Sequence, residues 1–258
     1  MLNGFVEAVR QHDPDRFFTA LFAPADKRDA LLALYEFNHE LARARAMVSE
    51  PHLALIRLHW WREVLEGTAK RHPLAEALSR CLDDGSLDAG DLMGLIDARE
   101  VEAEAEIATV SDWFWYLMNS AGGLTAAAAR LLGAEGPDAL RPLGAAYGVA
   151  EILRATPALA RQGRCLLPAD VLAEYGLSPA GVVSGEDAAP AIRDLAAKGL
   201  ALLRPERLGR RAIAAALPAV LARRDLLRLR ATAMGSDVPR GLGDRLAVTW
   251  AAWRGRIG

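Results

Sequence analysis

The sequence predicts an all-α protein, and three observations support this fold class. The 258 residues include 51 alanines but only 27 valines, isoleucines and threonines together. Alanine has the highest helix propensity, whereas β-branched residues favour strands. No stretch of useful length alternates apolar and polar residues as a half-buried strand does. With 52% hydrophobic and 25% charged residues, the composition is that of a globular chain and excludes a disordered one.

Proline residues mark the expected helices in the first part of the chain. Asp13 followed by Pro14 is a cap and first-turn pair, so a short helix is expected to start there. Pro24 precedes a long pattern, at about 26–49, in which apolar residues recur at spacings of three and four. The next helix is expected over 51–67, between a proline and a glycine.

Helical periodicity continues through the rest of the chain. Further helices are expected at about 73–82, 89–108, 112–132, 138–155, 187–203, 207–233 and 242–254. Pro157 lacks a backbone N–H and is expected to end its helix just past Arg154. The glycine- and proline-rich segment 157–190 is expected to be a functional loop, because similar helical sequence lies on both sides of it. Residues 1–258 are therefore expected to form one domain.

Charge and cysteine content exclude several classes of function. The 31 basic and 33 acidic residues give a formal net charge of −2, so no overall positive field favours nucleic acid as a partner. Cys81 and Cys165 lack metal-ligand spacing and are expected to be reduced thiols of a cytoplasmic protein. The first residues lack the apolar core of a signal peptide, and the longest uncharged stretch, 113–129, is short and polar for a membrane span.

Two separated runs of sequence resemble the squalene/phytoene synthase family. The first run is LYEFNHELARARAMVSEP at 34–51, and the second is AYGVAEILRATPALARQGRCLLP at 146–168. The segment LIDAREVEAE at 95–104 and Tyr116, followed by AGG, also match. The resemblance covers about 13–180 and, more loosely, the remainder. It implies an isoprenoid-synthase bundle of helices around a central cavity, the fold of enzymes that join two prenyl diphosphates head to head.

The family's metal-binding positions lack carboxylates in this chain. The resemblance implies that aspartates on two facing helices hold magnesium, which neutralises the departing diphosphate and prefers oxygen ligands. The corresponding positions here hold Ala42, Arg43 and Ala46 in the first run, and Ala155, Ala158 and Leu159 in the second. A methyl group cannot coordinate magnesium. We therefore expect no metal site, no cofactor and no catalytic residue.

An active enzyme is the alternative that the sequence leaves open. Glu50 and Glu151 each lie one helical turn, about 5.4 Å, from a missing ligand position. With such displaced ligands the chain would be a magnesium-dependent prenyltransferase that condenses two prenyl diphosphates. A third hypothesis is a simple isoprenoid-binding module.

Several polar residues around the two runs are candidates for binding a substrate or lipid. They are Tyr35, Tyr116, Tyr147, Arg154, Arg161 and Arg164. The arginines suit a prenyl diphosphate or local carboxylates, and the tyrosines suit a prenyl pocket or core packing; both interpretations stay open. Asp97, Glu100 and Glu104 are expected on a solvated helix face. The five histidines show no catalytic or metal spacing, and we assign them no role.

The first run is also similar to a non-catalytic branch of the family, whose mitochondrial relative assists assembly of respiratory complex I. This resemblance implies a catalytically silent assembly factor with a protein partner and a relic pocket for an isoprenoid such as a quinone tail. The expected location is cytoplasmic, peripheral on the inner face of the membrane. Tryptophan beside arginine suits a membrane interface. Trp250 and Trp253, near Arg254, are better candidates for that contact than the adjacent pair Trp60 and Trp61.

Overall fold

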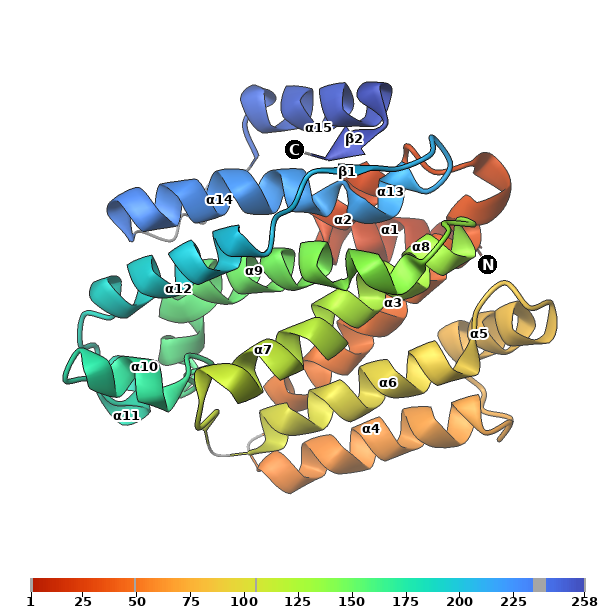
Figure 1. Cartoon of the computed structure of the whole chain (residues 1–258). Coiled ribbons are helices and arrows are strands. Elements are labelled where there is room, and N and C mark those ends of the chain that lie inside the picture. Colours follow the sequence, from red (N-terminus) through yellow and green to blue (C-terminus); the bar gives the residue numbers. More distant parts are fainter. Residues whose placement is uncertain (1, 49, 105, 234–239, 258) are drawn as a thin grey trace.

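The computed structural model describes residues 2–48, 50–104, 106–233 and 240–257, and it confirms the all-α fold (Figure 1). The first helices are α1 (Leu2–His12), α2 (Pro14–Ala20), α3 (Ala25–Ala46), α4 (Pro51–Leu65), α5 (Pro73–Asp83), α6 (Ala89–Glu100) and the 3₁₀ turn η1 (Val101–Ala103). Then follow α7 (Val110–Asn119), α8 (Ala121–Leu131), η2 (Pro137–Leu140), α9 (Arg141–Arg161), α10 (Ala169–Glu174), α11 (Pro179–Val183) and α12 (Ala189–Ala201). The last elements are β1 (Glu206–Arg207), α13 (Ile213–Ala216), α14 (Pro218–Thr232), α15 (Leu242–Arg254) and β2 (Arg256–Ile257).

Several helices begin where the sequence signals place them. The Asp13 side chain accepts a hydrogen bond from the backbone N–H of Arg16 at 2.9 Å, which caps α2 as predicted. Helix α3 follows Pro24, and α4 starts at Pro51. Helix α15 has the predicted bounds. The prediction missed α1, which packs on α3 and buries Phe5 and Val9.

The helix predicted over 207–233 is divided in the structure into β1, α13 and α14, and two further predicted helices are also broken. The helix predicted over 112–132 divides at Ser120, whose ψ of −86° is not helical. The Ser120 hydroxyl and backbone N–H both donate to the carbonyl oxygen of Tyr116, at 2.7 and 2.8 Å. The helix predicted over 89–108 ends as α6 at Glu100 and continues only as the turn η1. Both boundaries place side chains on the site described below.

The prediction that Pro157 ends its helix is wrong, because α9 continues through it to Arg161. The buried residues Ile152, Leu153 and Thr156 hold this turn against the core, and Pro157 itself is exposed. Proline costs the helix one hydrogen bond, which this packing offsets. The segment 157–190 is also less irregular than predicted, since it contains α10 and α11.

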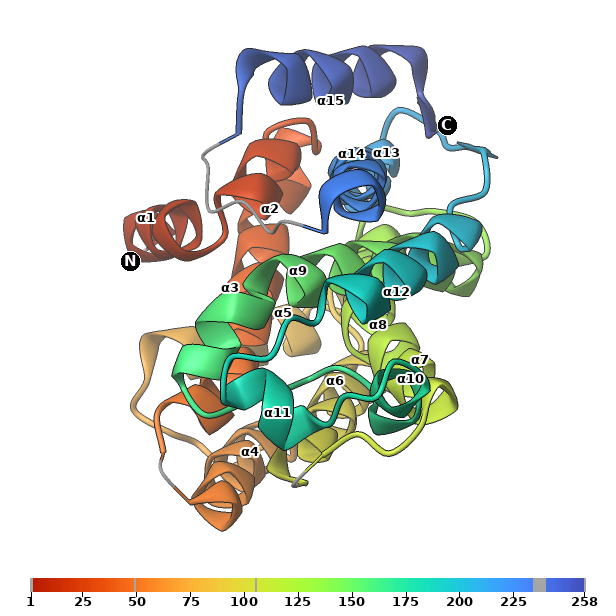
Figure 2. The same cartoon turned by 90° about the vertical axis from the view of Figure 1, so that its left-hand side faces the viewer.

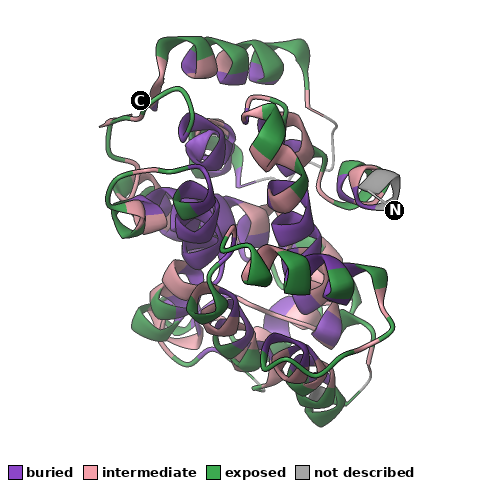
Figure 3. Cartoon of the chain, turned by 90° about the vertical axis from the view of Figure 1, so that its right-hand side faces the viewer, coloured by how far each residue is buried: buried purple, intermediate pink, exposed green. Residues whose placement is uncertain are grey.

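Helix α9 lies in the middle of the molecule, between α7 and α8 on one side and α12 and α14 on the other (Figures 1 and 2). Its contact with α8 depends on Gly144, since a Cβ there would collide with the carbonyl oxygen of Ala121 and with Thr125 Oγ1. Buried residues concentrate in these central helices (Figure 3). Helix α15 lies across the outer side of α14, beside the short antiparallel ribbon of β1 and β2.

Candidate functional site

A cavity of about 660 Å³ opens among α2, α3, η1, α7 and α9. Ala42 and Ala46 line it from α3, and Ala155 and Leu159 line it from α9. Four of the six positions that lack the family's carboxylates therefore belong to one cavity wall, although the two pairs are distant in sequence; Arg43 and Ala158 do not line it. Three methyl groups and one isobutyl group occupy the positions where the resemblance implies magnesium ligands.

The remaining carboxylates on the wall do not form a magnesium site. They are Asp13, Asp15, Glu102 and Glu151. Each of them is bonded to at least one arginine, so its oxygens already neutralise a cation. Among the described residues, no three histidine, cysteine or acidic side chains lie close enough together to hold a metal ion. Magnesium is bound through a few carboxylates that are free to coordinate it, together with waters. The arginine-bound carboxylates of this cavity do not fit that requirement.

Glu102 is the centre of the first ion-pair cluster in the cavity. Its Oε1 lies 2.6 Å from Arg99 Nη1 and accepts a hydrogen bond from the Tyr116 hydroxyl at 2.8 Å, while Oε2 accepts from Arg164 Nη2 at 2.8 Å. Arg99 also donates to Asn38 Oδ1 on α3 at 3.1 Å. Burial alone raises the pKa of Glu102, but the two guanidinium groups and the phenol outweigh it and hold the pKa below its usual value. Glu102 is therefore an anion at neutral pH, and its partners are fixed.

Arg16 forms a second cluster on the α2 side. It lies 2.6 Å from Asp13 Oδ2 and 3.5 Å from Glu151 Oε2, and its guanidinium stacks over the Tyr147 ring at 4.6 Å. The Tyr147 hydroxyl donates to Asp15 at 3.2 Å. Enclosure by protein raises the pKa of Glu151, and the anions of Asp13 and Asp15 raise it further, while Arg16 opposes the shift. The protonated form of Glu151 is thus favoured relative to that of an exposed glutamate.

A third cluster joins the C-terminal part of the chain to the cavity. Arg240 binds Asp15 at 2.6 Å and Asp225, on α14, at 2.7 Å. Arg154 also binds Asp225, at 3.1 Å, while its buried Nε has no hydrogen-bond partner among the described residues. Three arginine–carboxylate contacts thus link α2, α9 and α14 around one end of the cavity.

The structure separates the predicted binding residues into two groups. Tyr116, Tyr147, Arg154 and Arg164 line the cavity. Tyr35 is buried in the core and Arg161 is exposed, and neither lines it. Glu50, considered as a displaced ligand, is also exposed and lies outside the cavity lining, whereas Glu151 belongs to it.

Sequence reasoning missed several residues of this site. Arg16, Arg99 and Glu102 were not singled out, although Glu102 lies within the matching segment at 95–104. Its neighbours Asp97 and Glu100 are exposed and bind Arg62, as expected for a solvated face. His12 and His39, given no role, stack at 4.2 Å on the cavity wall. Burial lowers the pKa of His39, and His12 and Arg43 lower it further, so its imidazole is neutral at pH 7.

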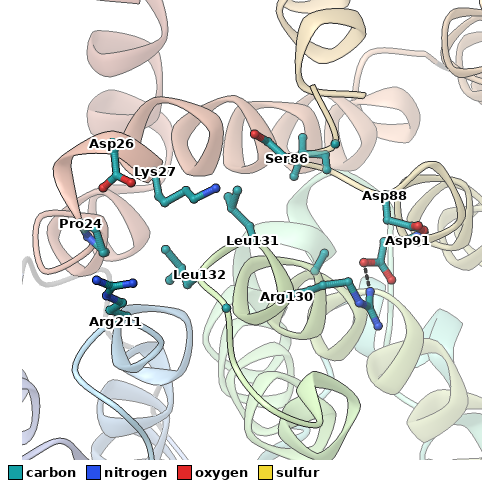
Figure 4. A pocket seen from close by; sticks show the side chains of 14 residues that line it. Pro24, Asp26, Lys27, Ser86, Asp88, Asp91, Arg130, Leu131, Leu132 and Arg211 are labelled. Carbon is teal, nitrogen blue, oxygen red and sulfur yellow. Dashed lines mark hydrogen bonds and ion pairs between the residues drawn. The ribbon is translucent and has the colours of Figure 1, made fainter. Parts of the chain in front are cut away.

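A second cavity, of about 590 Å³, lies between the start of α3, the turn after α5 and the end of α8 (Figure 4). Its lining mixes both charges: Lys27, Arg130 and Arg211 with Asp26, Asp88 and Asp91. Arg130 is bound to Asp91, and to Asp138 at 3.1 Å. None of the predicted site residues lines it, and we assign it no chemistry.

The tryptophan pairs differ in exposure. Trp61 is buried and stacks edge-on against Trp60, which is partly buried, so this pair belongs largely to the core. Trp250 and Trp253 stack at 5.1 Å and are 57% and 67% exposed. None of the described helices is long and apolar enough to cross a bilayer.

Comparison with known proteins places this geometry in context. The chain is 28% identical over 181 residues to the mouse protein, and 27% to the human protein, named NADH dehydrogenase (ubiquinone) complex I, assembly factor 6. These matches cover 67% of this chain and 54% of each relative, so the chain matches about half the length of these proteins. The Drosophila melanogaster homologue is 23% identical over 199 residues, which cover 72% of this chain and 60% of the homologue.

Solved structures of a dehydrosqualene synthase and a squalene synthase share the fold. A dehydrosqualene synthase crystallised with a ligand superposes with a TM-score of 0.76 at 16% identity, and the alignment covers 98% of this chain and 95% of that one. A squalene synthase of Alicyclobacillus acidocaldarius gives a TM-score of 0.62 at 18% identity, with the same coverage of both chains. The family model described as squalene/phytoene synthase matches residues 9–251. The chain therefore belongs to the squalene/phytoene synthase family.

Proposed function

We propose that this chain is a catalytically silent family member that assists assembly of a respiratory NADH dehydrogenase complex through a protein partner. The observation that carries the proposal is the cavity wall at Ala42, Ala46, Ala155 and Leu159, which presents no oxygen ligand where the family's chemistry demands magnesium. The names of the mouse, human and fly relatives support the assembly role.

The pairing of the cavity's arginines also supports catalytic silence. Arg164 and Arg154 occupy positions that the resemblance places beside a diphosphate. In this chain they bind Glu102 at 2.8 Å and Asp225 at 3.1 Å. A diphosphate would have to displace these carboxylates, and a buried carboxylate left without its cation is costly.

The cavity itself suits a ligand other than a diphosphate. Its volume of about 660 Å³ lies within the roughly 300–1,000 Å³ typical of small-molecule sites. Leu117, Ile152, Leu159 and Leu166 give it apolar surface beside the ion pairs. We propose an isoprenoid, such as a quinone tail, as its ligand. We further propose a cytoplasmic location, peripheral on the inner face of the membrane.

The catalytic part of the proposal is tested with purified protein, farnesyl or geranylgeranyl diphosphate, and magnesium, with release of diphosphate as the readout. We expect no release above a reaction without protein, while an active squalene synthase in the same buffer shows turnover. Glu151→Gln is the informative variant, since Glu151 lines the cavity one helical turn before Ala155, a missing ligand position. If the unmodified chain releases diphosphate and the Glu151→Gln variant does not, the proposal is wrong and the chain is an active prenyltransferase.

The assembly role is tested by deleting the gene in its source organism. We expect less fully assembled NADH dehydrogenase complex in native gels stained for NADH oxidation, and restoration by the unmodified gene. If the gene carrying Glu151→Gln also restores the assembled complex, the assembly role does not depend on any residual catalysis. A deletion strain with a normal amount of assembled complex contradicts the role.

A further inference from the structure

The outer face of α15 is apolar and has no partner within the described chain. Leu242, Leu246, Trp250 and Trp253 are 79%, 67%, 57% and 67% exposed. Their spacing of three and four residues places them on one side of the helix. The opposite side, with Val248 and Ala251, packs on α14. The helix at the top of Figure 3 accordingly shows its exposed residues on the side that faces away from the molecule.

A small basic pocket adjoins this face. It has a volume of about 160 Å³ and lies between α14, α15 and the ribbon. Arg204, Arg223, Arg254 and Arg256 line it, and its lining contains no acidic residue. Trp250 lines it too, and the Arg254 guanidinium lies 5.8 Å from the centre of the Trp250 ring. The apolar face and the basic pocket are therefore one continuous surface.

The charges of these four arginines are not neutralised within the described part of the chain. None of the four forms an ion pair there, in contrast to Arg224 and Arg228 on the same helix as Arg223, which bind Asp244 at 2.5 and 2.8 Å. The neighbouring strand β1 contributes Glu206 and Arg207, so it adds no net charge. Carboxylates thus neutralise the arginines under α15 and leave those of the pocket for an external anion.

We propose that α15 and this pocket form a docking surface for a membrane rich in anionic phospholipids. In this arrangement the tryptophans and leucines enter the interfacial region, and the arginines bind headgroup phosphates. Charge complementarity selects this occupant, because an apolar stripe beside a pocket lined by four unpaired arginines matches an anionic bilayer surface. The pocket is too small for a whole lipid but accepts a phosphate group. The inference rests on the peripheral location proposed above and is independent of the assembly role.

Sedimentation with lipid vesicles tests the surface on the purified full chain. One set of vesicles is phosphatidylcholine alone, and the other contains phosphatidylcholine and phosphatidylglycerol. We expect binding to the anionic set to be stronger by about tenfold or more and to weaken as salt is raised. Arg204→Gln combined with Arg223→Gln and Arg254→Gln should remove most of that preference, and Trp250→Ala with Trp253→Ala should weaken binding to both sets.

Matched controls separate the surface from general charge and aromatic content. Arg80→Ala, on α5, and Trp115→Ala, on α7, change exposed residues elsewhere on the molecule and should leave binding unchanged. Circular dichroism checks that each variant is folded. Equal binding to the two vesicle sets, binding to neither set, or equal losses in the control variants overturns the proposal. None of these outcomes bears on the native-gel test of complex assembly, so the two proposals fail separately.

Discussion

Arg164 Nη2 lies 2.8 Å from Glu102 Oε2, which ties the turn after α9 to the turn after α6 across the cavity. The side chains of both residues are nearly buried, at 11% and 6% exposure. Since Glu102 also binds Arg99 and Tyr116, one carboxylate organises side chains from η1, α6, α7 and the end of α9. The polar wall of the cavity therefore depends on a residue that has no counterpart in the metal-binding motifs.

Glu102→Gln should destabilise the protein by about 3–5 kcal/mol, because two buried guanidinium groups lose their anion. Urea unfolding followed by circular dichroism measures the change. Glu100→Gln, two residues earlier, is the matched control: Glu100 is exposed, and Arg62 keeps its contact with Asp97. The control should change the free energy of unfolding by no more than about 1 kcal/mol. Equal effects of the two substitutions would show that the Glu102 cluster does not stabilise the fold.

The two glutamates of the cavity should give opposite pH dependences. The pKa of Glu102 is lowered in the folded state, so its stabilisation is present above its unfolded pKa and is lost as pH falls through the folded pKa. The pKa of Glu151 is raised in the folded state, so its contribution to stability is present below the unfolded pKa and is lost as pH rises through the folded pKa. Unfolding at a series of pH values measures both effects.

The unmodified protein should be more stable than Glu102→Gln near neutral pH, and this difference in the free energy of unfolding should shrink as the pH is lowered. Compared with Glu151→Gln, the unmodified protein should lose stability as the pH rises from about 4 toward neutrality. Parallel pH profiles for the two variants would contradict this assignment of the charges.

Restoring carboxylates should create the missing metal site. In Ala42→Asp combined with Ala46→Asp, Ala155→Asp and Leu159→Asp, four acidic side chains would line the cavity from two facing helices. We expect this variant to be less stable without metal, because the carboxylates repel one another, and its melting temperature to rise with magnesium. The unmodified chain, titrated with magnesium in the same way, should show no shift. A shift of the same size in the unmodified chain would contradict our interpretation of the alanines.

Gly144 should not tolerate alanine. A Cβ there collides with the Ala121 carbonyl oxygen and Thr125, so α8 and α9 must separate, at a cost of about 1–3 kcal/mol. Gly94, in α6, is the control, because a Cβ at that position meets no atom within 4 Å. Gly94→Ala should stabilise the protein by about 0.5–1 kcal/mol through helix propensity. Thermal unfolding of the two variants compares them, and stabilisation by Gly144→Ala would contradict the close packing of these helices.

Local sequence predicted the helices and the apolar part of the cavity wall. Proline and its capping partner Asp13 determine where α2 starts, and Ala42, Ala46 and Ala155 could be located because they replace ligands at known positions in two motifs. The charged part of the wall could not be predicted in this way. Glu102 acquires its role from Arg164, 62 residues away, and nothing near either residue in the sequence specifies that pairing.

The errors at helix boundaries have a similar origin. Pro157 breaks an isolated helix, but the burial of Ile152, Leu153 and Thr156 keeps this turn in place. The stretch around Ser120 is strongly helical in sequence, yet the backbone departs from the helix there, at a ψ of −86°, and no local signal explains the break. At Pro157 tertiary packing outweighs local propensity.

The contact between Asp15 and Arg240 has a consequence for how the protein matures. These residues are separated by 225 positions along the chain, so the wall that they share is completed only after nearly the whole chain has left the ribosome. Until then Asp15 lacks the cation that Arg240 provides. The end of the cavity where Arg240 joins Asp15 and Asp225 is thus assembled last, after the N-terminal helices have been made.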